Sequence, residues 1–87
     1  MSYKVTVTPA PAKFLERLRN EALKRRLIKA LRALETDHRP PGTVKLQGAD
    51  ELYRVRVADY RIVYQIQDAV LVVLVVEIGH RREIYRR

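Results

Sequence analysis

The chain has 87 residues, of which 47% are hydrophobic and 32% are charged, a balance typical of a folded chain rather than a disordered one. This length suits one modest core, so we expect a single domain over residues 1–87. The absence of cysteine excludes disulfides and thiolate metal sites. The formal net charge of +8 favours a polyanionic partner, either nucleic acid or an acidic protein. The plainer alternative is a soluble protein that happens to be basic.

Location and cofactors are bounded by the same composition. The longest apolar run, residues 69–76, is far too short to span a membrane. The first residues lack the apolar core of a secretory signal, so we expect a cytoplasmic protein that contacts no membrane. Two histidines, His38 and His80, are too few for a structural zinc site. We therefore expect no metal and no other cofactor.

The N-terminal half predicts one strand and two helices. Residues 3–9 alternate apolar with polar side chains and are rich in β-branched residues, which indicates a strand. The prolines that follow suit the start of a helix, which residues 12–20 continue. Asn20 can cap a second helix over residues 21–35, and helices joined this tightly should form an antiparallel hairpin. The apolar stripe of the second helix consists of Leu23, Leu27, Leu31 and Leu34.

The C-terminal half predicts three strands. A loop marked by prolines and glycines, residues 36–50, precedes them. The strands cover residues 52–57, 61–67 and 70–78, with short turns between them. The last strand is apolar at nearly every residue, so it should be central and covered on both faces. The element order β-α-α-β-β-β predicts an α+β fold, in which an N-terminal helical hairpin packs on one face of a small antiparallel sheet.

Arginines recur on one face of the predicted hairpin. The alternation of side chains along a strand should bring Arg54, Arg56 and Arg61 together on the open face, away from the helices. Like charges directly opposite each other destabilise a sheet by roughly 0.2–1 kcal/mol per pair. Glu77 and Asp59 are able to neutralise the cluster in part. We favour an anion site, because arginine suits bidentate phosphate contacts. The positions expected to be buried are Tyr53, Val55, Val57, Ile62, Tyr64 and Ile66.

The stretch KLQGADELYRVRVADYRIVYQIQDAVLVVLVVEIGHRREIY, residues 45–85, resembles the RelE/ParE superfamily of bacterial toxins from toxin–antitoxin pairs, and within it the RelE-like branch. The specific part is K-L-x-G, Y-R-V-R-V, D-Y-R, an apolar strand and G-H-R ending in E-I-Y, in this order. The resemblance implies a compact α+β toxin that enters the ribosomal A site and cleaves messenger RNA without a metal. It also implies an acidic antitoxin that wraps and neutralises the toxin, and a toxin–antitoxin complex that binds operator DNA through the antitoxin.

The resemblance implies roles for individual residues. Arg61 matches the arginine that stabilises the charged transition state, and Arg81 matches the residue assigned to phosphate stabilisation and sometimes to protonation of the leaving group. Tyr85 matches the candidate general base or base-stacking residue. His80 is a second candidate base because imidazole titrates near neutrality, or else an ordinary surface histidine. The residues expected to bind RNA phosphates are Lys45, Arg54, Arg56, His80 and Arg82.

Two other functions stay open. Arginine cannot accept a proton in a protein, so any lysine base of the relatives is lost at Arg54 and Arg56. The short spacing from Arg81 to Tyr85, close to the end of the chain, would leave Tyr85 far from the site. A ParE-like inhibitor that binds DNA gyrase and cuts nothing is then the alternative, and a plain RNA-binding module is the third. The joint presence of Arg61, Arg81 and Tyr85 favours the nuclease.

Overall fold

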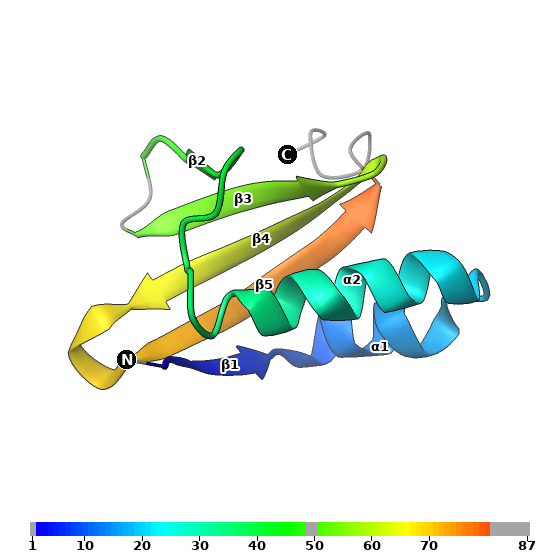
Figure 1. The fold of residues 1–87 in the computed structure, drawn as a ribbon, viewed down its shortest axis with the longest axis horizontal. Coiled ribbons are helices and arrows are strands. Elements are labelled where there is room, and N and C mark those ends of the chain that lie inside the picture. Colours follow the sequence, from blue (N-terminus) through cyan, green and yellow to red (C-terminus); the bar gives the residue numbers. More distant parts are fainter. Residues whose placement is uncertain (1, 49–50, 81–87) are drawn as a thin grey trace.

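The computed structural model describes residues 2–48 and 51–80. Two helices lie on one side of a twisted five-stranded sheet (Figure 1). The α+β class and the helical hairpin over the sheet are confirmed. The elements are β1 (Lys4–Val7), α1 (Pro9–Arg17), α2 (Glu21–Ala33), β2 (Val44–Lys45), β3 (Leu52–Val57), β4 (Tyr60–Gln67), a 3-10 turn (Asp68–Val70) and β5 (Val72–His80).

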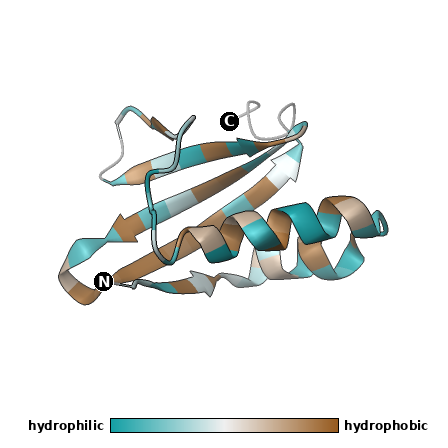
Figure 2. Cartoon of the chain, in the orientation of Figure 1, coloured by the Kyte–Doolittle hydropathy of each residue, from teal (hydrophilic) through white to brown (hydrophobic). Residues whose placement is uncertain are grey.

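The helical hairpin forms close to its predicted bounds. Helix α1 begins at Pro9, one of the two prolines expected to start it, because proline's fixed φ and missing N–H are tolerated in the first turn. Helix α2 is capped as expected: the Oδ1 atom of Asn20 accepts a hydrogen bond from the backbone N–H of Leu23 at 3.0 Å. Leu27 of α2 and Leu34, which caps its C-terminal end, are fully buried. In Figure 2 the helices alternate between apolar and polar residues, as amphipathic helices do.

The sheet has the strand order β1-β5-β4-β3-β2. Strand β1 runs parallel to β5 and the other pairs are antiparallel, so the sheet is mixed rather than antiparallel throughout. No short hairpin joins β1 to β5, and therefore no turn fixes their relative direction. The short strand β2 was not predicted, because it has only two residues and both are exposed.

The prediction that the last strand is central holds in part, because β5 is an interior strand and none of its residues is exposed. The middle strand is β4, and β5 lies between β1 and β4. In β5, Val73, Val75 and Ile78 are buried, whereas Val72 and Leu74 are only half-buried. The apolar run therefore predicted full burial of every residue, whereas in the structure buried and half-buried residues are mixed along the strand, a difference that periodicity alone cannot indicate.

A bulge interrupts the pairing of β4 with β5. Val63 pairs with Glu77 and Tyr64 pairs with Val75, so Val76 is the additional residue on β5. An additional residue reverses which side chains of the strand point to each face beyond it. This is why Val75 and Ile78, three positions apart, are both buried.

The register divides the sheet side chains into two faces. The helix face carries the core residues, among them Tyr53, Ile62 and Tyr64, which cluster with the leucines of α2. The outer face is the opposite one. Strands β3 and β4 pair Arg54 with Val63 and Arg56 with Arg61, and directly opposed residues share a face. The predicted assignment of the side chains of this hairpin to a helix face and an arginine face is confirmed.

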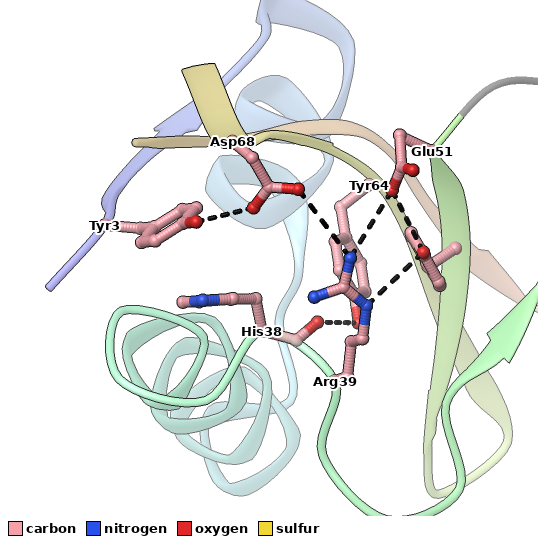
Figure 3. A network of polar contacts seen from close by, with 7 residues as sticks. Tyr3, His38, Arg39, Glu51, Tyr64 and Asp68 are labelled. Atoms are coloured by element: carbon pink, nitrogen blue, oxygen red, sulfur yellow. Dashed lines mark hydrogen bonds and ion pairs between the residues drawn. The ribbon is translucent and has the colours of Figure 1, made fainter. Parts of the chain in front are cut away.

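A second group of polar side chains, here called the polar network, ties the loop after α2 to the helix face (Figure 3). Arg39 donates from Nε to the Tyr53 hydroxyl at 3.3 Å and from Nη2 to Oε2 of Glu51 at 3.4 Å. The Tyr64 hydroxyl donates to the backbone carbonyl of His38 at 2.7 Å. The network consists of Tyr3, His38, Arg39, Glu51, Tyr53, Tyr64 and Asp68.

Burial and neighbouring charges shift two tyrosines of this network. Burial raises the pKa of the Tyr64 hydroxyl, because the charged phenolate loses hydration. The pKa of Tyr3 is also raised, since its hydroxyl donates a hydrogen bond to the Asp68 carboxylate. The Tyr3 ring stacks on His38 with 3.7 Å between ring centroids. Both hydroxyl groups therefore stay protonated as donors at neutral pH.

Candidate functional site

The arginine cluster, Arg54, Arg56 and Arg61, lies on the outer face beside the β3–β4 turn. Arg56 and Arg61 are directly opposite each other, and Arg54 is two residues from Arg56 on the same strand. On the other side of Arg61, strand β5 presents Gly79. Gly79 adds no side chain beside Arg61 on this strand.

Arg61 is buried, which corrects the expectation of an exposed side chain. Its exposed fraction is 2%, and its neighbour Val63 on the same face is 3% exposed. Arg61 lies on the middle strand and therefore has neighbours on both sides, whereas Arg56 on β3 remains exposed. A charge with little water around it interacts more strongly with other charges than an exposed one does. The outer face is thus not uniformly open.

The acidic residues that were expected to offset the cluster take different places. Glu77 lies on the outer face, in a row with Val63 and Arg54. Two strand spacings separate Glu77 from Arg54 in this row, roughly 9–10 Å between backbones. Asp59 lies in the β3–β4 turn and makes no ion pair with any residue in the ranges 2–48 and 51–80. Neutralisation by Asp59 is therefore not observed among these residues.

His80 lies on the helix face and not beside the arginine cluster. It pairs with Tyr60, and the two rings meet edge to face with 5.5 Å between centroids. Arg61 pairs with Gly79 and so faces the other way. The register therefore does not place His80 on the face of the arginine cluster, and its role in binding phosphate stays a prediction. The bulge in β5, which alternation alone does not predict, decides the face of His80.

Lys45 is also separated from the cluster. It pairs with Tyr53, so it shares the helix face, while Val44 is opposite Arg54. The expectation that Lys45 joins the phosphate-binding set is therefore not supported by the register. The remaining predicted residues, Arg81, Arg82 and Tyr85, lie outside the described residues.

A cavity that the sequence did not indicate lies on the helix side of the β3–β4 turn. It has a volume of about 360 Å³. We call it the turn cavity, and it is lined by Asn20, Ala22, Leu23, Arg26, Ala58, Asp59 and Tyr60. No motif could have revealed it, because its two walls come from segments more than 30 residues apart. Within the described ranges, no group of three or more His, Cys, Asp or Glu residues is placed to hold a metal ion.

A model of a known family matches almost the whole chain. Residues 5–85 match the model described as "ParE toxin of type II toxin-antitoxin system, parDE". The chain belongs to this family of the RelE/ParE superfamily. It is accordingly a toxin of a toxin–antitoxin system. A comparison with curated proteins found no significant match.

Solved structures of other members of the superfamily share the fold. The chain is 29% identical to a chain of the archaeal RelE–RelB complex from Pyrococcus horikoshii OT3, with a TM-score of 0.82 and coverage of 93% of this chain and 97% of the other. A mutant of the E. coli toxin RelE in the free state is 27% identical, with a TM-score of 0.80 and coverage of 99% and 93%. The RelBE2 complex from Mycobacterium tuberculosis, at 19% identity, shows the likeness of fold alone, with a TM-score of 0.79 and coverage of 93% and 100%. No helix within residues 2–48 and 51–80 is long and apolar enough to cross a membrane.

Proposed function

We propose that this toxin is a metal-independent endoribonuclease that cleaves messenger RNA in the ribosomal A site and so inhibits translation. The observation that carries the proposal is the juxtaposition of Arg56 and Arg61, with Arg54 beside them on one face. Opposed arginines lower stability unless an anion lies between them. The similarity to RelE structures at 27–29% identity over more than nine tenths of the chain supports the same branch.

The cluster suits cleavage by the 2′-hydroxyl of the RNA itself. This hydroxyl attacks the adjacent phosphorus, the bond to the 5′ oxygen breaks, and the products are a 2′,3′-cyclic phosphate and a 5′-hydroxyl. Negative charge grows on the nonbridging oxygens during attack, and positioned arginines stabilise it. Arg56, which is exposed, binds the incoming phosphate, and the buried Arg61 contacts it in the complex. This proposal requires the exposed fraction of Arg61 to rise when RNA binds.

The proton transfers are assigned to the C-terminal residues. A base must accept the 2′ proton and an acid must protonate the leaving 5′ oxygen. Tyr85 as base and Arg81 beside the leaving group remain predictions, because both lie outside the described residues. The position of His80 on the helix face argues against the imidazole as base. Neighbouring arginines would favour a tyrosine phenolate by stabilising its negative charge.

The partners follow from the same proposal. The solved relatives include complexes of RelE with its antitoxin RelB. We propose an acidic cognate antitoxin for this basic chain, and operator binding by the complex through that antitoxin. Action on ribosomes implies a cytoplasmic location.

The test is cleavage in a translating cell extract. The purified toxin is added, and the ends of the messenger RNA are mapped by primer extension. We expect new ends within codons, formed only when ribosomes translate the message. Lys29→Ala, an exposed charge change on α2, is the matched control for Arg61→Ala. Intact message with both the parent toxin and Lys29→Ala would overturn the nuclease proposal.

A second candidate is inhibition of DNA gyrase without any nuclease activity. Two observations favour it: the matching family model is that of ParE, and Arg61 is 2% exposed. A supercoiling assay with purified gyrase separates the two functions. Arrested supercoiling together with intact message would select this candidate, and unaffected supercoiling together with cleaved message would select the nuclease.

A further inference from the structure

The turn cavity is a built concave site on the face opposite the arginine cluster. The first turns of α2 form one wall and the β3–β4 turn forms the other. Its volume of about 360 Å³ lies within the range of about 300–1,000 Å³ that small-ligand sites occupy. Every lining residue belongs to the described ranges. The cavity is thus large enough for one small organic ligand.

The turn cavity is lined by one cationic and one anionic side chain. Arg26 and Asp59 are exposed, and neither makes an ion pair within residues 2–48 and 51–80. The Asn20 side chain uses its oxygen to cap α2, which leaves its amide N–H groups as donors. The cavity therefore offers a cation, an acceptor and amide donors at one place.

An aromatic ring completes the lining. Tyr60 is half-buried in the cavity wall. Its ring is packed against Phe14, with 5.7 Å between centroids, and against the edge of His80 at 5.5 Å. These contacts hold the ring in place before any ligand arrives. A preformed aromatic surface of this kind stacks on nucleobases of any type.

This combination of groups fits one class of ligand. A guanidinium suits a phosphate, a tyrosine ring suits a base, and a carboxylate accepts hydrogen bonds from the N–H groups of a base edge. The Asp59 carboxylate would repel an acidic peptide, and the polar groups of the cavity do not suit a lipid chain. We infer that the turn cavity binds one nucleotide of single-stranded RNA, with its base on Tyr60 and its phosphate on Arg26.

The neighbouring residues link this site to the arginine cluster. The pair Val57–Tyr60 is adjacent to the pair Arg56–Arg61 in the register, a step of about 3.3 Å along the strand. An RNA strand that passes around the end of the hairpin would contact Arg56 on the outer face and Tyr60 on the helix face. The site is therefore distinct from the arginine cluster but within reach of the same RNA.

The test is a titration of the full-length protein followed by the backbone amide signals in NMR spectra. The probes are the four ribonucleoside 5′-monophosphates, with ribose 5-phosphate as the probe that lacks a base. We expect saturable shifts centred on Arg26, Asp59 and Tyr60. At least one nucleotide should bind about tenfold more tightly than ribose 5-phosphate, because only the nucleotide stacks on Tyr60.

Three variants sharpen the test. Arg26→Ala should weaken nucleotide binding about tenfold through loss of the charged contact. Arg25→Ala removes the same charge from an exposed neighbour that does not line the cavity, and binding should stay within twofold of the parent. Tyr60→Phe keeps the ring and should also bind normally. Equal affinity for ribose 5-phosphate, equal effects of the two arginine variants, or loss of binding in Tyr60→Phe would overturn the inference. No ribosome is used, so a failure to cleave message leaves this result unaffected.

Discussion

The polar network and the arginine cluster differ in the charges that they place side by side. In the network, the single cation Arg39 meets two carboxylates, at 3.4 Å for Glu51 and 3.9 Å for Asp68. In the cluster, Arg56 faces Arg61 across the strands. The first arrangement pairs one cation with two carboxylates, whereas the second places two cations directly opposite each other, which lowers stability in a sheet. The polar network therefore stabilises the fold, whereas the opposed arginines of the cluster lower its stability.

The largest effect is expected at the cluster. Arg61→Ala should lower the rate of message cleavage about 10²- to 10³-fold, or roughly 2.7–4 kcal/mol, by analogy with deletion of other transition-state donors. Primer extension in the translating extract measures the rate, and circular dichroism checks that the fold persists. A variant as toxic as the parent at equal expression would remove Arg61 from the site.

The next effect is expected in the network. Tyr64→Phe deletes the hydroxyl that donates to the His38 carbonyl at 2.7 Å from a fully buried side chain. We expect the free energy of unfolding to fall by about 1–2 kcal/mol, with cleavage unchanged. Urea denaturation measures the first quantity and the extract assay the second. Slower cleavage at unchanged stability would mean that the two regions are not independent.

Alkaline unfolding provides a control for the same variant. Burial raises the pKa of Tyr64 in the folded state above the unfolded value of about 10. The stability that the protonated Tyr64 hydroxyl contributes is therefore complete below about pH 10 and is lost as the pH rises through the pKa of the folded state. Between neutral and alkaline pH, the free energy of unfolding should fall less in Tyr64→Phe than in the parent protein. The fall that remains in the variant should come from Tyr3, whose pKa is also raised.

Arg39→Gln tests the charge balance of the network directly. Arg39 is about half exposed, at 46% of its side-chain surface, so its ion pairs should contribute only about 0.2–1 kcal/mol. We expect a loss of stability of this size that shrinks in high salt because exposed charges are screened. Unfolding curves at low and high salt provide the measurement.

Arg56→Gln should have the smallest effect and the opposite sign. Removing one of two opposed arginines relieves repulsion and should raise the free energy of unfolding by roughly 0.2–1 kcal/mol. Cleavage should slow at the same time, since a phosphate contact is lost. Arg25→Gln, an equal charge change on the exposed surface of α2, should alter neither. A loss of stability in Arg56→Gln would contradict the contrast between the two regions.

Local patterns predicted most of the fold. The leucine spacing placed α2 and its buried stripe, Asn20 marked its cap, and alternation divided β3 and β4 into two faces. Contacts between distant segments were not predictable in this way. Alternation along the strand did not predict the burial of Arg61, and the polar network joins residues such as Tyr3 and Asp68 that are 65 positions apart. The face of His80 depends on one additional residue in β5.

The bulge at Val76 also affects which register β5 can adopt when it pairs with β4. If β5 paired with β4 without the bulge, continuing from the Val75–Tyr64 pair, Glu77 would lie opposite Ile62 on the helix face. That register would move a carboxylate into a core whose Ile62 is fully buried, at a cost of several kcal/mol. It would also place Ile78 beside Arg61 in place of Gly79. The slipped pairing is therefore strongly disfavoured relative to the pairing with the bulge.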